Sequence, residues 1–191
     1  MNRIIYLIRH GKTPGNLEKR YIGITDEELS PEGIAELKNI HYPKTDIVFS
    51  SPLKRALSTA EVLFPEAKPI IIEDIRETDF GEFEGKNYDD LKTDPGYQAW
   101  IDSGGKAPFP SGESFEEANI RALKGFRKIL ELSQDKRTVS VVTHGGVIMA
   151  VLQNLFGGDY YDYHIENGKG YSFEISSDGL CSRLSSGLYT G

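Results

Sequence analysis

Residues 3–11 read Arg3-Ile4-Ile5-Tyr6-Leu7-Ile8-Arg9-His10-Gly11. The apolar run has no helical period, which is typical of a strand buried on both faces of a parallel sheet. Beyond it, three breakers of regular structure, Gly11, Pro14 and Gly15, predict a loop. We therefore expect a buried strand that ends with Arg9 and His10 at one edge of a sheet.

Strand-like and helix-like segments alternate along the rest of the chain. Further strands are expected at 46–50, 69–73, 138–143 and 171–175, the last near a sheet edge. Residues 77–112 are rich in Gly, Asp and Pro and predict loops and short helices, and the tail from residue 185 onward is expected to be loose.

Helix starts are marked by capping residues. Ser30 before Pro31 and Ser51 before Pro52 each predict a cap followed by a proline at the first helical position. Ser114 opens a capping box before a long amphipathic helix, and another helix follows residue 144 to about residue 156. The alternation predicts an α/β fold with a mostly parallel sheet, formed by one domain over residues 1–191.

The composition excludes several classes of protein. The net charge of −7 argues against a nucleic-acid or membrane-surface partner, although a local basic pocket remains compatible with it. No stretch approaches the roughly 20 apolar residues of a membrane span. The single cysteine, Cys181, allows no intramolecular disulfide, and no Cys/His spacing predicts a metal site. We expect a cytoplasmic protein without a metal.

Two of the four histidines follow predicted strands and precede glycine, in Arg9-His10-Gly11 and in His144-Gly145-Gly146. Sites of open parallel sheets lie beyond the carboxyl ends of the strands. Glycine lets the backbone approach a ligand closely, and the helix that begins at Gly145 offers free N–H groups to an anion. Either histidine alone could simply bond local backbone, but the pair beside Arg9 favours a shared site.

Arg55 lies in the first turn of the helix that follows Ser51-Pro52. A helical wheel places it opposite an apolar stripe. That stripe consists of Leu53, Ala56, Leu57, Ala60 and Leu63. The position of Arg55 is compatible with a solvated surface arginine, and equally with a guanidinium that binds a phosphate together with Arg9. Position alone leaves both interpretations open.

Four carboxylates follow the third predicted strand: Glu77, Asp79, Glu82 and Glu84. A phosphoester hydrolase needs one acid that protonates the leaving oxygen. The residues alone do not choose among the four, and a solvated acidic loop is the simpler interpretation for any one of them.

Five segments in order resemble the motifs of the histidine phosphatase superfamily, the phosphoglycerate mutase-like proteins. Residues 9–16 match R-H-G-x-T-x-x-N. The other segments are 51–60 with Ser51-Pro52-Leu53-Lys54-Arg55-Ala56, 76–85 with Arg76-Glu77, 110–114 with Pro110-Ser111-Gly112-Glu113-Ser114, and 142–146 with His144-Gly145-Gly146. A single motif would be weak, but the five together span most of the chain.

The resemblance implies a three-layer α/β/α sandwich and a phosphohistidine mechanism without metal or cofactor. His10 corresponds to the nucleophile and Glu77 to the proton donor that later activates water. Arg9, Asn16, Arg55, His144 and Gly145 correspond to the phosphate pocket. Three positions depart from the family's usual residues: Lys12 replaces an acidic residue of the mutases, Glu36 a frequent glutamine, and Phe83 a common tryptophan.

The resemblance favours a phosphomonoester hydrolase acting on a small phosphorylated metabolite. Our specific hypothesis is α-ribazole 5′-phosphate, from assembly of the cobalamin nucleotide loop, because the chain resembles the α-ribazole phosphatase branch. Tyr97, Trp100 and Phe109, in a segment that is either a lid or part of the core, could stack on its aromatic base. The alternatives are a phosphoglycerate mutase, whose longer insertions this chain has little room for, and a non-catalytic phosphate-binding module. A homodimer is left open.

Overall fold

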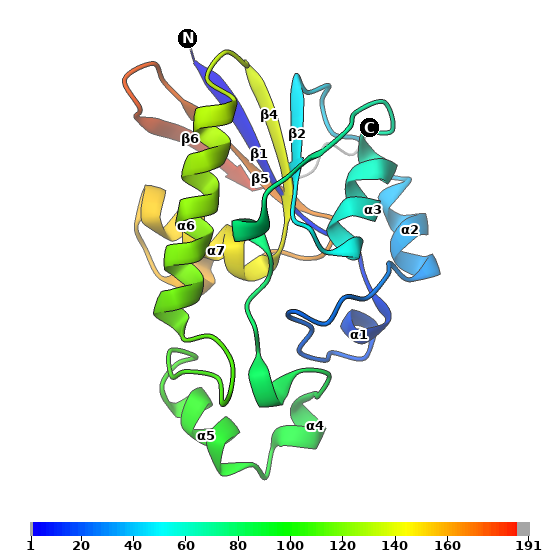
Figure 1. Cartoon of the computed structure of the whole chain (residues 1–191), viewed down its shortest axis with the longest axis vertical. Helices are drawn as coiled ribbons and strands as arrows, with labels where there is room; N and C mark the ends of the chain where they lie inside the picture. The colour runs from blue at the N-terminus through cyan, green and yellow to red at the C-terminus, as the bar shows by residue number, and fades with distance from the viewer. Residues whose placement is uncertain (1, 187–191) are drawn as a thin grey trace.

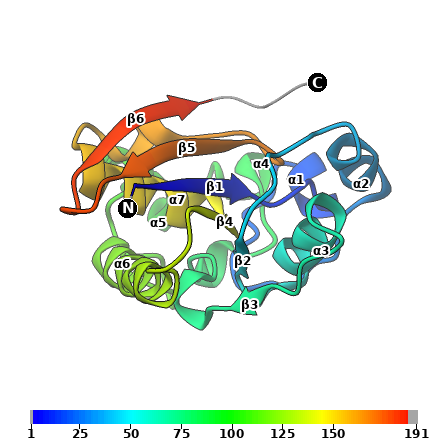
Figure 2. The ribbon, with the colours of Figure 1, turned by 90° about the horizontal axis from the view of Figure 1, so that it is seen from above.

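Residues 2–186, which the computed structural model describes, form a six-stranded sheet in the order β3-β2-β4-β1-β5-β6 (Figures 1 and 2). The strands are β1 Arg3–Arg9, β2 Ile47–Ser50, β3 Ile70–Ile71, β4 Thr138–Thr143, β5 Gly170–Ile175 and β6 Cys181–Ser186. The first four are mutually parallel, and β5 and β6 are antiparallel additions at one side. The mostly parallel sheet expected from the sequence is confirmed.

Helices cover both faces of this sheet (Figure 2). Ile5 and Leu7 of β1 belong to a core with α6 (Phe115–Leu132) and α7 (Gly145–Phe156). Tyr6 and Ile8 point the other way, into a core with α3 (Lys54–Leu63), against which α2 (Pro31–Leu37) packs. Since successive side chains of a strand alternate between faces, an apolar run like β1 requires cover on both sides. The three-layer sandwich is thereby confirmed.

Two helix starts follow the expected capping chemistry. The Ser30 hydroxyl accepts a hydrogen bond from the Gly33 N–H at 3.0 Å, and Pro31 is the first residue of α2. Ser114 forms a complete capping box with Glu117 at the start of α6. These local bonds satisfy N–H groups that a helix leaves free at its N-terminus, so the sequence signal and the structure agree.

The prediction that Ser51 caps the next helix is wrong. The helix α3 begins at Lys54, its N-cap residue is Leu53, and the Leu53 side chain makes no capping bond. The first N–H of the helix, that of Lys54, donates to Asp26 Oδ1 at 2.8 Å. The Ser51 hydroxyl accepts from the Leu53 N–H at 3.3 Å, before the helix, and contacts a histidine ring described below. The expected loop after β1 also contains a short helix, α1 (Pro14–Leu17), which is capped by Thr13.

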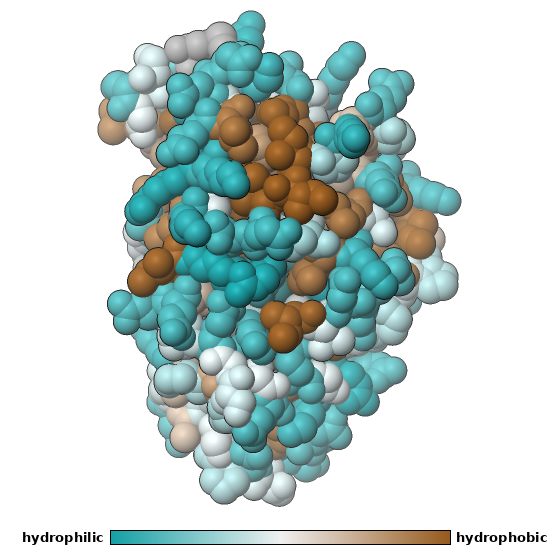
Figure 3. All heavy atoms as spheres, viewed as in Figure 1, coloured by the Kyte–Doolittle hydropathy of each residue, from teal (hydrophilic) through white to brown (hydrophobic). Residues whose placement is uncertain are grey.

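The sheet edges differ from the expectation. The strand expected at 69–73 is only two residues long, because residues 73–75 turn into the 3-10 helix η1 (Glu73–Ile75). At this edge Ile70 and Ile71 are 40% and 50% exposed. Figure 3 shows apolar surface over this part of the molecule.

At the opposite edge, residues 185–186 were expected to be loose but belong to β6, which pairs with β5. The polar, mostly exposed residues of β6 carry no hydrophobic signal. The hairpin turn between β5 and β6 contains Gly179, whose φ of 86° is in the region that favours glycine. The remainder of that tail lies outside the described residues.

Short elements gather beyond the carboxyl ends of the parallel strands, at the bottom of Figure 1. They include η2 (Gly81–Phe83), α4 (Tyr88–Leu91) and α5 (Pro95–Asp102), while η3 (Tyr160–Tyr163) packs against α7. Phe83, Leu91, Tyr97 and Phe109 form a small separate core there. Within residues 2–186 no helix is long and apolar enough to cross a membrane.

Candidate active site

His10 follows β1 directly and is 3% exposed. Its Nδ1 lies 2.7 Å from the Gly11 carbonyl oxygen. A carbonyl oxygen can only accept, so Nδ1 carries the proton of the neutral ring and the lone pair is on Nε2. The bond fixes both the tautomer and the orientation of the ring.

The environment keeps the His10 ring neutral. Burial lowers its pKa well below the ordinary value, and the charges of Arg55 and Arg9 lower it further, against a smaller raising effect of the Gly11 hydrogen bond. A neutral, oriented imidazole is a competent nucleophile, because its free nitrogen is not blocked by a proton.

His144 is fully buried at the end of β4, beside His10. Its Nε2 lies 2.7 Å from the Ser51 hydroxyl, and its Nδ1 is buried without a hydrogen-bond partner. Burial lowers the pKa of His144 well below the ordinary value, and the charges of Arg55 and Arg9 act in the same direction. The structure thus brings the two histidines of the sequence pattern together.

Arg55 is fully buried, so the interpretation of a solvated surface arginine is wrong. Its Nη1 donates to the Thr25 carbonyl at 2.8 Å and its Nη2 to the Gly23 carbonyl at 2.6 Å. Arg9 donates from Nη1 to the Ile165 carbonyl at 2.6 Å. The Nε of each arginine is buried without a partner. Each guanidinium therefore keeps a donor that a bound anion could use.

Burial lowers the pKa of Arg9 and of Arg55, and the charge of Glu77 acts against this in both cases. The apolar stripe expected on α3 is only partly right, because Ala56 and Ala60 are buried whereas the leucines of the stripe are half-buried. Arg55 itself lies on the buried side, because the neighbouring loop at 22–25 supplies carbonyl acceptors for it.

Thr59 was not assigned a role from the sequence. It lies one turn after Arg55 on α3, and its hydroxyl donates to the Arg55 carbonyl at 2.6 Å and accepts from the Gly11 N–H at 2.9 Å. This threonine ties the loop after His10 to α3. The i, i+4 spacing of Arg55 and Thr59 was the available signal, since residues four apart share a helix face.

Glu77 lies two residues after η1 and is 7% exposed. Its Oε1 accepts from the Thr78 N–H at 2.9 Å and its Oε2 from the Gly146 N–H at 3.4 Å. The carboxyl group therefore lies at the N-terminus of α7. A Cβ on Gly146 would be 2.6 Å from Glu77 Oε1, so the close approach requires glycine at this position.

The other three candidate acids are placed differently. Asp79, Glu82 and Glu84 each accept hydrogen bonds from the loops around them. None of the three lines the cavity that Glu77 and Arg9 share. The tertiary structure thus separates carboxylates that the residues alone left equivalent.

Asn16 lies at the rim of this site, in α1. Its Oδ1 accepts from the Asn167 Nδ2 at 3.2 Å, and the same Nδ2 donates to the His10 carbonyl at 3.1 Å. Asn167 was missed in the sequence because it comes from the distant loop before β5.

Gly145 is the first residue of α7. A Cβ at this position would be 3.6 Å from the Arg9 Cζ. The Gly145 N–H and the Arg9 guanidinium therefore border the same space.

A cavity of about 240 Å³ opens beside Arg9 and Glu77. Its aromatic wall consists of Tyr21, Phe80, Trp100, Phe109, Phe115, Tyr160 and Tyr161. The two histidines are at most 3% exposed and do not line the cavity themselves, but their chain neighbours Arg9 and Gly145 do. The cavity therefore extends from the phosphate-binding candidates into apolar surroundings.

The segment between residues 97 and 109 divides between core and cavity wall. Trp100 and Phe109 line the cavity and are placed where stacking on a ligand is open to them. Tyr97 is not: it is 4% exposed, and its hydroxyl lies 2.9 Å from that of Tyr21. The idea that Tyr97 stacks on a ligand is therefore wrong, because its ring is enclosed by Phe83 and its neighbours.

Two of the three departures from the family pattern contact each other. Lys12 Nζ lies 2.6 Å from Glu36 Oε1, so the reversed charge at one position is matched at the other. Both residues line a second, larger cavity of about 850 Å³, which Arg9 also lines. The third, Phe83, is buried in the small aromatic core.

Within residues 2–186 no three His, Cys, Asp or Glu side chains gather in a way that could hold a metal ion.

Comparison with known proteins gives a consistent result. The family described as the histidine phosphatase superfamily (branch 1) matches residues 5–184. An adenosylcobalamin/alpha-ribazole phosphatase of Escherichia coli is 30% identical over 161 residues, which cover 80% of this chain and 79% of that protein. A 2,3-bisphosphoglycerate-dependent phosphoglycerate mutase of Cytophaga hutchinsonii is 32% identical over 167 residues, which cover 80% of this chain and 76% of that protein.

Solved structures agree on the fold. The crystal structure of the alpha-ribazole phosphatase from Shigella flexneri superposes with a TM-score of 0.84 at 25% identity. The superposition covers 98% of this chain and 96% of that one. Phosphatases and a mutase are thus all similar to this chain at comparable identity, so the comparisons alone do not choose between hydrolysis and transfer.

Proposed function

Because the chain belongs to the histidine phosphatase superfamily, we propose that it is a phosphomonoester hydrolase that carries the phosphoryl group on His10. The observation that carries this proposal is the state of the His10 ring. It is neutral, its Nδ1–H is held by the Gly11 carbonyl, and its Nε2 lone pair is free. Such a ring can attack phosphorus without prior loss of a proton.

In the first step Nε2 of His10 attacks phosphorus, a P–N bond forms, and the bond to the leaving oxygen breaks. Glu77 gives its proton to that oxygen, which departs as an alcohol. The phosphate pocket consists of Arg9, Asn16, Arg55, His144 and the Gly145 N–H. The free Nε–H groups of the two arginines and the N-terminus of α7 stabilise charge on the other phosphoryl oxygens.

In the second step a water molecule attacks the phosphohistidine. The Glu77 carboxylate, left ionised by the first step, takes a proton from this water while the P–N bond breaks. Inorganic phosphate leaves, His10 regains its Nε2 lone pair, and Glu77 is again protonated. Both steps balance with the groups present, and neither needs a metal or a cofactor.

For the substrate we propose a small phosphomonoester whose leaving alcohol carries an aromatic base, specifically α-ribazole 5′-phosphate. The support is the aromatic cavity beside Arg9 and Glu77, where Trp100 and Phe109 can contact a flat base. The names of several relatives point the same way. A preference of at least tenfold in kcat/KM over phosphoserine, 3-phosphoglycerate and fructose bisphosphate, about 1.4 kcal/mol, is expected.

Phosphoglycerate mutase activity is the alternative that uses the same pocket. A mutase must exclude water from the phosphohistidine and transfer the group to a second alcohol. The similarity to a mutase supports this alternative, whereas the short chain, with little room for insertions over the pocket, argues against it. A non-catalytic phosphate-binding module is disfavoured because nucleophile, acid and both arginines are all present.

A rapid-quench experiment separates these functions. With the proposed substrate, the wild type is expected to give phosphate bound to His10 that is stable in alkali and labile in acid, followed by inorganic phosphate. His10→Ala should show neither and should fold normally. Transfer to phosphoglycerate that depends on bisphosphoglycerate and outpaces hydrolysis would establish the mutase instead. Retention of more than a few per cent of turnover in His10→Ala would exclude a phosphohistidine at this position.

A further inference from the structure

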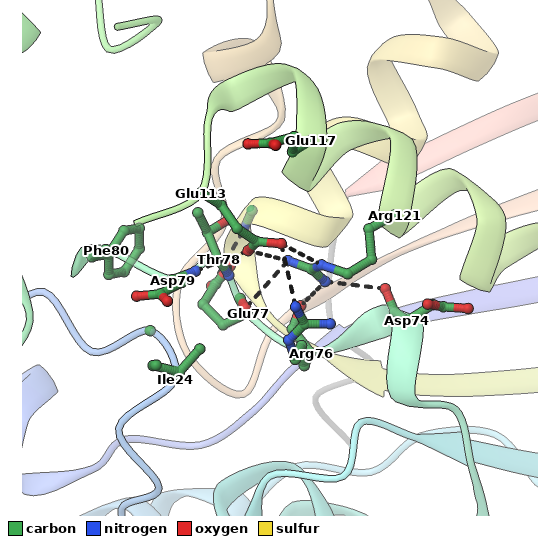
Figure 4. A network of polar contacts seen from close by, with 12 residues as sticks. Ile24, Asp74, Arg76, Glu77, Thr78, Asp79, Phe80, Glu113, Glu117 and Arg121 are labelled. Carbon is green, nitrogen blue, oxygen red and sulfur yellow. Dashed lines mark hydrogen bonds and ion pairs between the residues drawn. The ribbon is translucent and has the colours of Figure 1, made fainter. Parts of the chain in front are cut away.

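A half-buried ion pair between Arg121 and Glu113 holds the loop that carries Glu77. After η1 the chain runs without regular structure through Arg76, Glu77 and Asp79. The motif around Glu113 and the arginine at position 121 of α6 have no part in the phosphate pocket. Figure 4 shows both side chains against the backbone of this loop.

Arg121 donates to three backbone carbonyls, one in η1 and two in the loop that follows it. Its Nη1 bonds the Asp74 carbonyl at 3.1 Å and the Arg76 carbonyl at 2.8 Å. Its Nη2 lies 3.4 Å from the Glu77 carbonyl. The side chain is only 11% exposed. The Arg121 guanidinium thus fixes the backbone of the segment that carries the proposed acid, Glu77.

Glu113 completes the arrangement from the other side. Its two carboxylate oxygens accept from the Nε and Nη2 of Arg121 at 2.7 and 2.6 Å. Its Oε2 also accepts from the Asp79 N–H at 3.0 Å, while the Glu113 N–H donates to the Asp79 carbonyl at 3.0 Å. Burial raises the pKa of Glu113, but the hydrogen bonds from Arg121 and Asp79 outweigh this and lower it overall.

Two glycines make the close packing possible. A Cβ on Gly112 would be 2.5 Å from the Asp79 carbonyl oxygen, and a Cβ on Gly125 would be 2.7 Å from the Ile75 side chain. Gly125 lies one helical turn after Arg121, on the same face of α6. The helix can therefore lie directly against η1, close enough for the arginine to reach the loop carbonyls.

We propose that Arg121 and Glu113 form a positioning pair that holds the Glu77 carboxyl at the leaving-group oxygen. The inference rests on the proposed function, in which Glu77 is the acid. Neither residue touches the substrate; they act through the backbone on either side of Glu77. A general acid must lie within hydrogen-bond reach of its oxygen, so even a small displacement of this loop slows protonation.

The test compares two aryl phosphates of similar shape, phenyl phosphate and p-nitrophenyl phosphate. Phenolate is the poorer leaving group and needs the acid more. Arg121→Met, Arg121→Lys and Glu113→Gln are expected to lower kcat with phenyl phosphate roughly tenfold more than with p-nitrophenyl phosphate. The lysine variant keeps the positive charge but lacks the planar guanidinium with its several donors, so it should recover only part of the activity. It also provides a folded protein for the measurement if the methionine variant unfolds.

Lys124→Met is the matched control. This lysine is also on α6 and pairs with the Asp74 side chain at 3.2 Å, but it is 72% exposed and bonds no carbonyl near Glu77. Its removal should change kcat with both substrates by less than about twofold, in line with an exposed ion pair. A leaving-group effect in Lys124→Met as large as that in Arg121→Met would overturn the inference.

A double variant separates positioning from general stability. With phenyl phosphate, Glu77→Gln/Arg121→Met should be no slower than Glu77→Gln alone, because the positioned group is already gone. If the losses of kcat from Glu77→Gln and Arg121→Met simply add in the double variant, the positioning role is wrong. Equal losses of kcat with phenyl phosphate and p-nitrophenyl phosphate in Arg121→Met and Arg121→Lys would also overturn the positioning role, while leaving the acid role of Glu77 in place. If Glu77→Gln itself shows no dependence on the leaving group, the acid role fails, and the inference fails with it.

Discussion

The rings of His10 and His144 lie 5.1 Å apart between their centroids and are tilted by 57°. The two rings meet because β1 and β4 are neighbouring parallel strands, with Arg9 opposite Thr143 in register. Both rings are buried and feel the charges of Arg9 and Arg55, so neither ring favours the second proton that would make it a cation. The neutral pair with two cations beside it is suited to an anion, and its protonation has measurable consequences.

Mild acid should destabilise the protein through these two histidines. Their folded-state pKa values lie below the ordinary value of about 6.5, so the unfolded chain takes up protons first. The stabilising contribution is complete above about pH 6.5 and is lost as the pH falls towards the folded-state values. Urea unfolding between about pH 7.5 and 5.5 should show up to about 1.4 kcal/mol lost per pH unit for each histidine.

The variant His10→Gln identifies the source of this slope, since carboxylates also titrate in acid. It should make the pH dependence of the free energy of unfolding shallower than in the wild type. Equal slopes in the wild type and His10→Gln would show that burial of this ring is not coupled to proton uptake.

Arg55→Ala should lower kcat by roughly 10²–10³-fold, by analogy with the loss of one preorganised donor. Arg55→Lys should restore only part, because an ammonium cannot both bond the carbonyls at 22–25 and present a second donor in the fork geometry. The neighbouring Lys54→Ala, at an exposed site, is the control and should keep normal kcat. Near-normal kcat/KM in Arg55→Ala would remove this residue from the phosphate pocket.

Gly146→Ala should reduce activity without reducing stability. The new Cβ would be 2.6 Å from Glu77 Oε1, and the flexible end of that side chain can move away, so the fold survives while the acid is displaced. Alanine in a helix is favoured over glycine by up to about 1 kcal/mol. We expect a loss of kcat with phenyl phosphate of roughly tenfold or more.

Two substrates separate a displaced acid from a damaged phosphate pocket. Gly146→Ala should slow phenyl phosphate more than p-nitrophenyl phosphate, because the better leaving group needs the acid less. Steady-state kinetics and thermal unfolding of Gly146→Ala check this. Equal losses of kcat with the two substrates would contradict the placement of Glu77 at the N-terminus of α7.

Two fully buried serines should respond differently to removal of the hydroxyl. Ser51→Ala takes away the partner of His144 Nε2, which leaves a buried nitrogen unsatisfied and should cost about 1–3 kcal/mol. The Ser140 hydroxyl is buried without a partner, so Ser140→Ala should be neutral or stabilising. Chemical denaturation of both variants checks this, and equal destabilisation would contradict the difference in bonding.

Much of the fold could be predicted because its signals are local. The apolar run of β1 demands two covered faces, and the capping residues Ser30 and Ser114 mark helix starts through bonds to residues three positions away. By contrast, β6 is held by pairing with β5 through a polar edge, so its own residues carry no pattern. Ser51 failed as a cap because α3 begins three residues later, at Lys54, where Asp26 from a distant loop accepts the first N–H of the helix.

For the site, the order of residues along the chain was enough to predict that His10 and His144 follow strands of one parallel sheet and so meet at its carboxyl edge. The burial of Arg55, and the position of Glu77 rather than its neighbours beside Arg9, became clear from the folded chain. Both depend on carbonyls and N–H groups supplied by remote segments, at 22–25 and at Gly146. A side chain's hydrogen-bond partners far along the chain leave no periodic mark, whereas burial of a strand or the start of a helix does.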